Sequence, residues 1–330
     1  AILVRYRSRM VSSIVGTLGR GAVFLVLAHL AGALRGAPPS ESILPIYWVH
    51  IPKAGSSFQT TIVHATCGGS IPDGVTVKEA GAFFRHWKEQ CPKEKFLRFE
   101  CGHAPFEHPE MRAHAAVMVR DPLQRILSGY FAEPELHDCP RLQAQYNCTK
   151  KRCDGDVERD GRLTTNPSVI PPTEYAECVK DCSTNMLTGR SCDSASPPNV
   201  SLAIATLREF GFVGLTGEWE LSVCLWHAKF GGQPLAAELY NVRPGVKASH
   251  RGYDVKGLLG KWRPSSDARV YTAAKEHFRA ELERHNLTAK SCAEWLVRAG
   301  AKKQSKLWLT RFRADEQTEQ GYPAAVYDED

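Results

Sequence analysis

Three short apolar runs, each followed by a segment with a different periodicity, set the pattern of this chain. The runs cover residues 46–51, 115–119 and 210–215. Runs of this length that end at Pro, Gly or charged residues are typical of buried strands. Because helical spacing follows each of them, the pattern predicts an α/β core.

The segments after the first two runs carry clear helix signals. Phe58, Ile62 and Val63 recur with helical spacing, and the Cys67-Gly-Gly sequence closes this first helix. In the second segment, Asp121 is a suitable N-cap and Pro122 occupies the first helical position. A core-facing stripe is expected at Leu123, Ile126, Leu127 and Tyr130. Further helices are expected at 76–95, 174–187, 219–230 and 267–285, with a short strand at 96–99.

Length and composition fit one sizeable domain with an anionic ligand. The chain has 330 residues, of which 43% are hydrophobic and 24% charged, as is ordinary for a globular protein. The net charge of +6 suits an anionic cofactor or acceptor. A nucleic-acid binder would carry a denser cluster of positive charge, so that class is disfavoured.

The first 40 residues have a different composition from the rest. Three arginines precede an apolar run from 11 to 34, which predicts a cytoplasmic flank and signal anchor over residues 1–34. A cleaved signal peptide is the alternative. Residues 35–45 resemble a stem, residues 46–299 form the expected domain, and 300–330 form an expected poorly ordered tail.

Cysteine usage also indicates the secretory pathway. The chain has 11 cysteines, of which six lie between Cys139 and Cys192. This predicts a disulfide-stapled insertion over residues 133–200, whose pairing the sequence leaves open. Acceptor sequons for N-glycosylation begin at Asn147, Asn199 and Asn286.

The turn after the first apolar run has the composition of an anion-binding site. A strand, a turn of small residues and a helix bring backbone N–H groups and the positive end of the helix dipole together. Gly55 permits close backbone approach, Ser56 and Ser57 add hydroxyl donors, and Lys53 adds a mobile charge. A nucleotide-triphosphate P-loop is disfavoured, because there Lys follows the last Gly, whereas Lys53 precedes Gly55. The alternative is an ordinary α/β corner with a surface lysine.

A second set of candidates follows the second run. Arg120 ends a strand and Ser128 lies two turns along the next helix, so both could contact one phosphate. A structural ion pair between Arg120 and Asp121 and a bond from Ser128 to its own backbone are the alternatives. Arg125 is expected to be paired or to face solvent.

The motifs HIPKAGSSF, FECGHAPF, VRDPLQRILSGYF and FVGLTGE, with a late Asn-x-Arg, together resemble the Golgi carbohydrate sulfotransferases. The likeness is to the branch that contains the heparan sulfate 2-O- and 6-O-sulfotransferases. It covers about residues 46–285 and implies a P-loop-like fold with a central parallel sheet. It also implies that 3′-phosphoadenosine 5′-phosphosulfate (PAPS) is the sulfuryl donor, without a metal.

The resemblance assigns roles to residues of this chain. The 5′-phosphosulfate would bind the turn formed by Lys53, Ala54, Gly55, Ser56, Ser57 and Phe58. The 3′-phosphate would bind Arg120 and Ser128, and Asn241 and Arg243 would close over the cofactor, although a simple turn before Pro244 is an alternative. Lys53 would stabilise the departing phosphate. His103 matches the histidine that acts as general base in these relatives.

Other assignments for the region around His103 remain open. Glu100, Glu107 or Glu133 could act as the base or orient His103. Zinc ligation by Cys101, His103, His108 and His114 is disfavoured, because their spacing is not that of a known zinc site.

The expected function is transfer of a sulfuryl group from PAPS to a glycan hydroxyl in the Golgi lumen, by a single-pass type II membrane protein. A tyrosine-directed or glycolipid sulfotransferase is the alternative within the class. A binding protein that kept the fold but lost turnover is the alternative outside it. A kinase is disfavoured, because Gly-Lys-[Ser/Thr] and a metal-binding aspartate are missing.

Overall fold

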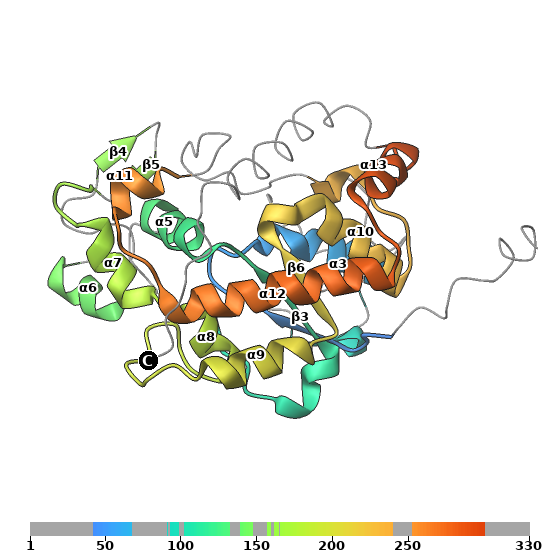
Figure 1. The fold of residues 1–330 in the computed structure, drawn as a ribbon, viewed down its shortest axis with the longest axis horizontal. Coiled ribbons are helices and arrows are strands. Elements are labelled where there is room, and N and C mark those ends of the chain that lie inside the picture. Colours follow the sequence, from blue (N-terminus) through green and yellow to red (C-terminus); the bar gives the residue numbers. More distant parts are fainter. Residues whose placement is uncertain are drawn as a thin grey trace, which may run out of the picture. The chain divides into compact units, whose positions relative to one another are not determined.

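Four parallel strands form the centre of the protein, as a computed structural model shows (Figure 1). The structure describes residues 42–67, 91, 93–98, 102–132, 139–147, 157–159, 162–164, 166–239 and 253–300. The expected anchor, most of the stem and the C-terminal tail lie outside these ranges. Within them, no helix is both long and apolar enough to cross a membrane.

The sheet contains β1 (Ile46–Val49), β2 (Phe96–Arg98), β3 (Ala115–Val119) and β6 (Phe212–Leu215), in the spatial order β2-β1-β3-β6. Each neighbouring pair is parallel, and Val49 pairs with Val117 while Val119 pairs with Leu215. Every residue of β1, β3 and β6 is buried. The carboxyl ends of these three strands therefore meet at one edge of the sheet, where parallel α/β folds place their ligands.

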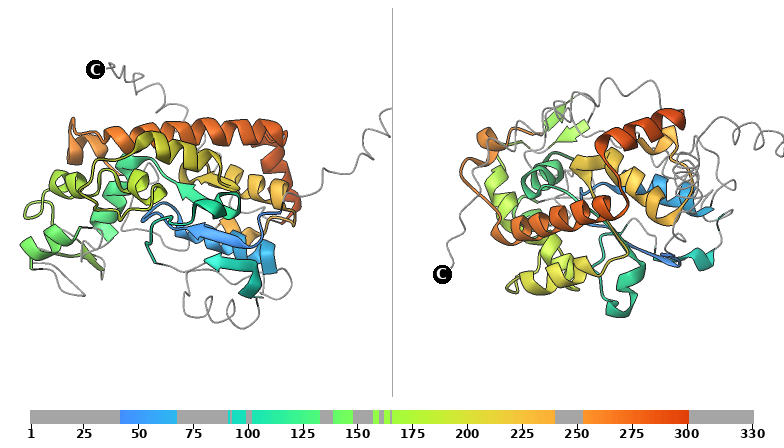
Figure 2. Two further views of the ribbon diagram at one scale, coloured as in Figure 1. Left: turned by 90° about the horizontal axis from the view of Figure 1, so that it is seen from below. Right: turned by 45° about the vertical axis from the view of Figure 1, so that its right-hand side comes forward.

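Helices flank this sheet. In Figure 1 the long helix α12 (Ser265–Arg284) crosses in front of β3 and β6, with α9 (Val200–Arg208) beside it. Figure 2 shows the same helix along the side of the sheet in two further views. The other α-helices are α3 (Gln59–Cys67), α5 (Pro122–Ala132), α6 (Pro140–Gln145), α7 (Pro172–Val179), α8 (Cys182–Leu187), α10 (Trp219–Phe230), α11 (Val255–Leu259) and α13 (Ala289–Arg298).

Short elements complete the described chain. A separate antiparallel pair consists of β4 (Val157–Arg159) and β5 (Arg162–Thr164). The 3-10 helices are η1 (Ser56–Phe58), η3 (Lys93–Lys95), η4 (Pro109–His114), η5 (Thr216–Glu218) and η6 (Ala236–Leu239). η1 and η5 each join the end of a central strand to the helix that follows it.

The α/β prediction and its main elements are confirmed. β3 and α10 have the bounds expected from the sequence, and α3 ends at Cys67. The carboxylate of Asp121 accepts the N–H of Gln124 at 2.9 Å, which makes it the expected cap of α5. The four residues of the predicted stripe on α5 are all buried. The helix expected at 76–95 lies mostly outside the described residues.

The prediction of one continuous helix over residues 174–187 is wrong. Residues 174–187 do not form a single helix but belong to α7 and α8, which are separated at Lys180 and Asp181. The break has a physical cause in the buried carboxylate of Asp267 on α12. It accepts the N–H groups of Ser183 and Thr184 at 3.1 and 2.9 Å, and thereby fixes a new helix start there.

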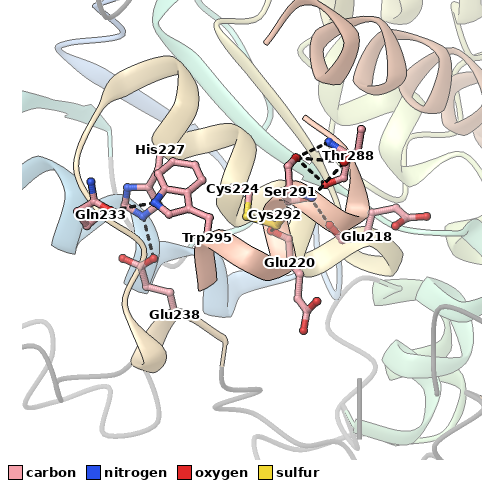
Figure 3. Close-up of a disulfide and its surroundings, with 11 residues drawn as sticks. Glu218, Glu220, Cys224, His227, Gln233, Glu238, Thr288, Ser291, Cys292 and Trp295 are labelled. Atoms are coloured by element: carbon pink, nitrogen blue, oxygen red, sulfur yellow. Dashed lines mark hydrogen bonds and ion pairs between the residues drawn. A yellow bond between two sulfur atoms is a disulfide. The ribbon is translucent and has the colours of Figure 1, made fainter. Parts of the chain in front are cut away.

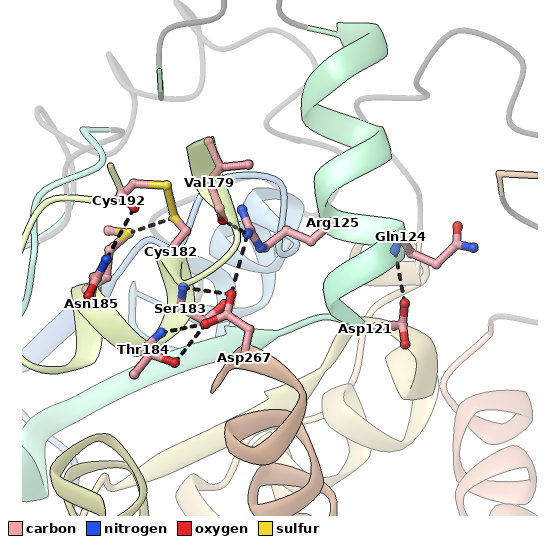
Figure 4. Close-up of polar contacts among 11 residues, drawn as sticks. Asp121, Gln124, Arg125, Val179, Cys182, Ser183, Thr184, Asn185, Cys192 and Asp267 are labelled. Carbon is pink, nitrogen blue, oxygen red and sulfur yellow. Dashed lines mark hydrogen bonds and ion pairs between the residues drawn. A yellow bond between two sulfur atoms is a disulfide. The ribbon is translucent and has the colours of Figure 1, made fainter. Parts of the chain in front are cut away.

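The same carboxylate joins three helices (Figure 4). Arg125 on α5 lies 3.4 Å from Asp267 and also donates to the carbonyl oxygen of Val179, and both charged side chains are almost fully buried. Burial raises the pKa of the Asp267 carboxyl, and the guanidinium of Arg125 opposes this rise. Arg125 is therefore paired, which is one of the two roles expected for it. It does not face solvent, which was the other.

Replacing Asp267 with alanine is expected to lower the free energy of unfolding by about 3–5 kcal/mol, because it leaves the charge of Arg125 buried without a partner. Asp254 offers a matched control, since it caps α11 at an exposed position and its loss should cost about 1 kcal/mol. Urea unfolding of both variants measures the difference. Equal losses would show that the buried pair has no special role.

Four disulfides connect the described cysteines: Cys67–Cys91, Cys139–Cys178, Cys182–Cys192 and Cys224–Cys292. Two of them lie inside the expected insertion, whereas Cys101, Cys148 and Cys153 lie outside the described residues. The Cys224–Cys292 bond attaches α13 to α10 (Figure 3). These four pairs fit the predicted disulfide bonding, and the insertion as a separate unit stays a prediction.

Candidate functional site

The two phosphate motifs expected from the sequence meet at one edge of the sheet. The guanidinium of Arg120, directly after β3, donates a hydrogen bond to the backbone carbonyl of Lys53, in the turn after β1, at 3.1 Å. The two residues are 67 positions apart in sequence. They come together because β1 and β3 are parallel neighbours, so that the turns following both strands leave the sheet on the same side.

The backbone of the Lys53 turn leaves several N–H groups for a ligand. Lys53 and Gly55 both have left-handed conformations, with φ of 60° and 107°. The N–H of Ala54 donates to Ile51 and that of Phe58 to Gly55. In the described part of the chain, the N–H groups of Gly55, Ser56 and Ser57 form no hydrogen bond. Three successive N–H groups at a helix start are the usual donors to a bound phosphate or sulfate.

Gly55 is required by its surroundings as well as by its φ angle. A Cβ atom at this position would lie 3.1 Å from the Thr216 hydroxyl and 3.2 Å from the Trp219 ring. Both residues follow β6, the third strand whose end reaches this edge. The turn is therefore enclosed on one side by the residues after β6, and a side chain at position 55 would displace them.

Thr216 holds the turn through a second carbonyl. Its hydroxyl donates to the carbonyl oxygen of Ala54 at 2.7 Å. Arg120 and Thr216 thus bind the consecutive carbonyl oxygens of Lys53 and Ala54 from two different strands. Carbonyl oxygens repel an anion, so holding them against these donors leaves the N–H groups of the turn to face the ligand. We refer to the two hydrogen bonds as the carbonyl clamp.

Replacing Thr216 with valine keeps the volume but removes one hydrogen bond of the clamp. We expect affinity for a phosphate-bearing ligand of the turn to fall by roughly three- to tenfold, the equivalent of about 0.5–1.5 kcal/mol. Thr216→Ser should retain the affinity, because it keeps the hydroxyl. Calorimetric titration with adenosine 3′,5′-bisphosphate measures both variants. Unchanged binding by Thr216→Val would show that the clamp does not shape the turn.

Phe58 has a packing role in this structure. Its side chain is fully buried and its ring stacks on Phe212 at 5.2 Å between centroids. The rings of Trp219 and Trp226 meet it edge-on at 5.6 and 5.9 Å. Phe58 therefore anchors the end of the turn to the core.

Arg120 has the surroundings of an anion-binding residue. Its guanidinium is half-buried, and burial lowers its pKa, although an arginine stays charged at neutral pH. Among the described residues, no carboxylate lies within ion-pairing distance of it. The alternative of a structural pair with Asp121 is not formed, because that carboxylate caps α5. Most of the guanidinium donors of Arg120 thus have no partner in the described part of the chain.

Ser128 lies two turns along α5 and is buried. Within the described ranges its hydroxyl forms no hydrogen bond, so the alternative of a bond to its own backbone is not observed. Between Arg120 and Ser128, the side chain of Gln124 forms two hydrogen bonds with the backbone of Tyr253, at 2.9 and 3.3 Å. The Tyr253 ring stacks on that of Phe131 further along α5, at 5.6 Å.

Tyr253 and Lys275 are neighbours of this site that the sequence analysis missed. The Tyr253 hydroxyl acts electrostatically on Arg120. Burial raises the pKa of the Asp121 carboxyl, and the charges of Arg120 and Lys275 oppose this rise, so Lys275 lies within electrostatic reach. Its ammonium group lies 5.3 Å from the centre of the Tyr271 ring. Positive charge from two separate segments, the end of β3 and α12, therefore lies near the start of α5.

His103 lies near the end of β1, in the exposed loop that precedes η4. Its ring meets that of His50 at 4.9 Å between centroids, with an angle of 71° between the ring planes. His50 directly follows β1 and stands three residues before Lys53. His103 thus lies at the same edge of the sheet as the Lys53 turn.

The other candidate bases and ligands have partners of their own, lie elsewhere on the same loop, or fall outside the described residues. His108 pairs with Glu110 at 3.1 Å, and His114 contacts the carbonyl of Ile43 at 3.1 Å. Glu107 is exposed on the same loop. In the described ranges, no three side chains of His, Cys, Asp or Glu form a group that could hold a metal ion. Residues named above that lie outside the description are Glu100, Cys101, Glu133, Asn241 and Arg243.

Comparisons of the chain with protein-family models, with curated proteins and with solved structures gave no match. The function is therefore inferred from the geometry of this edge of the sheet. Lys53 and Arg120, three open N–H groups and a nearby pair of histidines lie at this edge, with serines at 56 and 57 in the turn. Such a site can bind an anion with two phosphate groups and supply a basic nitrogen beside it.

Proposed function

We propose that this protein is a sulfotransferase that moves a sulfuryl group from PAPS to a hydroxyl group of a glycan. The observation that carries the proposal is the hydrogen bond from Arg120 to the carbonyl of Lys53. It supports a single ligand with two anionic groups, because the turn after β1 and the start of α5 lie side by side. PAPS carries its 5′-phosphosulfate and its 3′-phosphate at separate positions of one nucleoside.

The residues at this edge fit such a ligand. The open N–H groups of Gly55, Ser56 and Ser57, with Lys53, suit the 5′-phosphosulfate. Arg120 uses one guanidinium donor for the Lys53 carbonyl, so that its other donors can bind a ligand, and Ser128 adds a hydroxyl. An arginine can hold phosphate oxygens in a fork geometry, which suits the 3′-phosphate. Asn241 and Arg243 remain candidates to close over the nucleotide.

When bound, PAPS supplies the sulfuryl group and leaves as adenosine 3′,5′-bisphosphate. His103 takes the proton of the acceptor hydroxyl as that oxygen bonds to sulfur. The ammonium group of Lys53 would stabilise the negative charge that develops on the bridging oxygen as its bond to sulfur breaks. The carbonyl clamp keeps the turn in the conformation that these contacts need. The scheme uses no metal ion.

The N-terminal features complete the proposal. A basic flank followed by an apolar run at 1–34 supports a type II membrane protein whose domain lies in the Golgi lumen. The four disulfides support an oxidising compartment. The proposed partners are a glycan chain and the membrane, and no role for nucleic acid is proposed.

Transfer of labelled sulfate from PAPS tests the function. The acceptors are a panel of desulfated glycans, with a tyrosine peptide and a glycolipid as alternatives. We expect label on at least one glycan and none on the peptide. Label on the peptide or the glycolipid alone would reassign the acceptor. Binding of adenosine 3′,5′-bisphosphate without transfer to any acceptor would indicate a binding protein that lacks turnover.

A further inference from the structure

His50 is a buried histidine at the edge of the sheet for which the proposed reaction has no role so far. Its exposed fraction is 5%, although it stands directly after β1 and three residues before Lys53. Behind it, the ring of Trp48 lies nearly parallel at 6.3 Å. Trp48 stacks in turn toward Phe58 at 6.5 Å. His50 thus forms the outer end of an aromatic row that is fixed in the core.

His103 has the opposite character, because its ring is exposed and its loop contains no α-helix or strand. The loop is anchored three residues later at Phe106, which is buried and whose N–H donates to the carbonyl of Met186 at 2.8 Å. Because this anchor is three residues away, it does not set the direction of the His103 ring, which depends on the contacts of the ring itself. The edge-to-face contact with His50 connects that ring to a rigid element.

We infer that His50 is a positioning residue that holds the His103 imidazole at the end of β1, beside the Lys53 turn. The inference rests on the proposed function, in which His103 is the general base. Burial of His50 and its position directly after β1 fix one ring, and the edge-to-face contact transmits that position to the exposed ring. A general base must lie within hydrogen-bond reach of the proton it removes, so the orientation of this ring matters for the rate.

The contact joins the two rings edge to face, a geometry that an aromatic ring without nitrogen atoms can also adopt. His50→Phe keeps an aromatic ring of similar size, whereas His50→Ala removes the contact. We expect kcat to fall by about 10- to 100-fold in His50→Ala, because a small displacement of a catalytic group has effects of that size. His50→Phe should retain kcat within about threefold, and neither variant should change the dissociation constant of adenosine 3′,5′-bisphosphate more than about twofold.

Two reference variants accompany them. His103→Ala removes the base and sets the lower limit of transfer. His64→Ala removes another buried histidine, on α3, and should leave kcat unchanged. If His50→Ala has the wild-type kcat, the inference is wrong. If a folded His50→Phe is as slow as His103→Ala, the nitrogens of His50 take part in the chemistry, and the inference is also wrong.

A measurement without turnover separates this inference from the proposed function. In proton NMR spectra of the histidine rings, the His103 signal is identified by its loss in His103→Ala. We expect this signal to move in His50→Ala and to stay unchanged in His64→Ala. If the wild-type protein transfers no sulfate but the signal moves, the proposed function fails while the positioning contact stands. A signal that stays in place in His50→Ala would contradict the contact itself.

Discussion

Replacing Lys53 with alanine is expected to lower kcat by roughly a thousandfold, which is the scale of losing one group that stabilises developing negative charge. In the proposed reaction that charge appears on the oxygen that leaves sulfur, and the ammonium of Lys53 is the group proposed to stabilise it. The affinity for adenosine 3′,5′-bisphosphate should fall far less, because the backbone N–H groups of the turn remain. Initial rates of sulfate transfer at saturating PAPS measure the effect.

The backbone conformation of Lys53 demands a second variant. Lys53 has φ of 60°, a left-handed value that disfavours any residue with a Cβ atom. Alanine keeps that atom, so Lys53→Ala isolates the charge, whereas Lys53→Gly also relieves the backbone. Both should be equally slow if the charge is what matters. Lys180 is an exposed lysine paired with Glu177, so Lys180→Ala should keep the wild-type rate. A Lys53→Gly variant with near wild-type kcat would remove Lys53 from catalysis.

Replacing Arg120 with alanine is expected to weaken the binding of adenosine 3′,5′-bisphosphate by about 10- to 100-fold, because charge-assisted hydrogen bonds contribute about 1.5–3 kcal/mol. From the sequence alone, the expected effect is chiefly on donor binding. The structure adds a second effect, since Arg120 also holds the carbonyl of Lys53. We therefore expect kcat to fall as well, because the Lys53 turn loses one half of its carbonyl clamp.

Ser128→Ala is the matched control for Arg120→Ala. Ser128 belongs to the same expected phosphate site, but within the described residues it forms no hydrogen bond with the turn. Its loss should weaken binding without a change in kcat. Titration with adenosine 5′-phosphate, which lacks the 3′-phosphate, should show little difference between Ser128→Ala and wild type. An Arg120→Ala variant that binds both nucleotides like the wild type would remove Arg120 from the ligand site.

Sequence patterns predicted most of the central layer. The apolar runs gave β1, β3 and β6 because strands buried on both faces leave no room for polar residues. Local capping residues gave the start of α5. Helices α9 and α13 were not predicted. Their N-cap residues, Asn199 and Thr288, can be recognised in the sequence once the helix starts are known.

The rest of the site depends on contacts between residues far apart in sequence. Thr216 reaches Ala54 across 162 positions, and no local pattern marks its hydroxyl as different from that of any other threonine. The break between α7 and α8 depends on Asp267, which is more than 80 residues away. His50 looks like one more residue of an apolar run until the His103 loop is placed against it. Only the arrangement of the strands brings these pairs together.

A crystal structure of the protein with adenosine 3′,5′-bisphosphate is the most direct test of the central claim, that one nucleotide spans the turn after β1 and the start of α5. The account predicts the 5′-phosphate within hydrogen-bond distance of the N–H groups of Gly55, Ser56 and Ser57. It places the 3′-phosphate against Arg120 and Ser128. A nucleotide bound elsewhere, or one that reaches only one of the two groups, would contradict it.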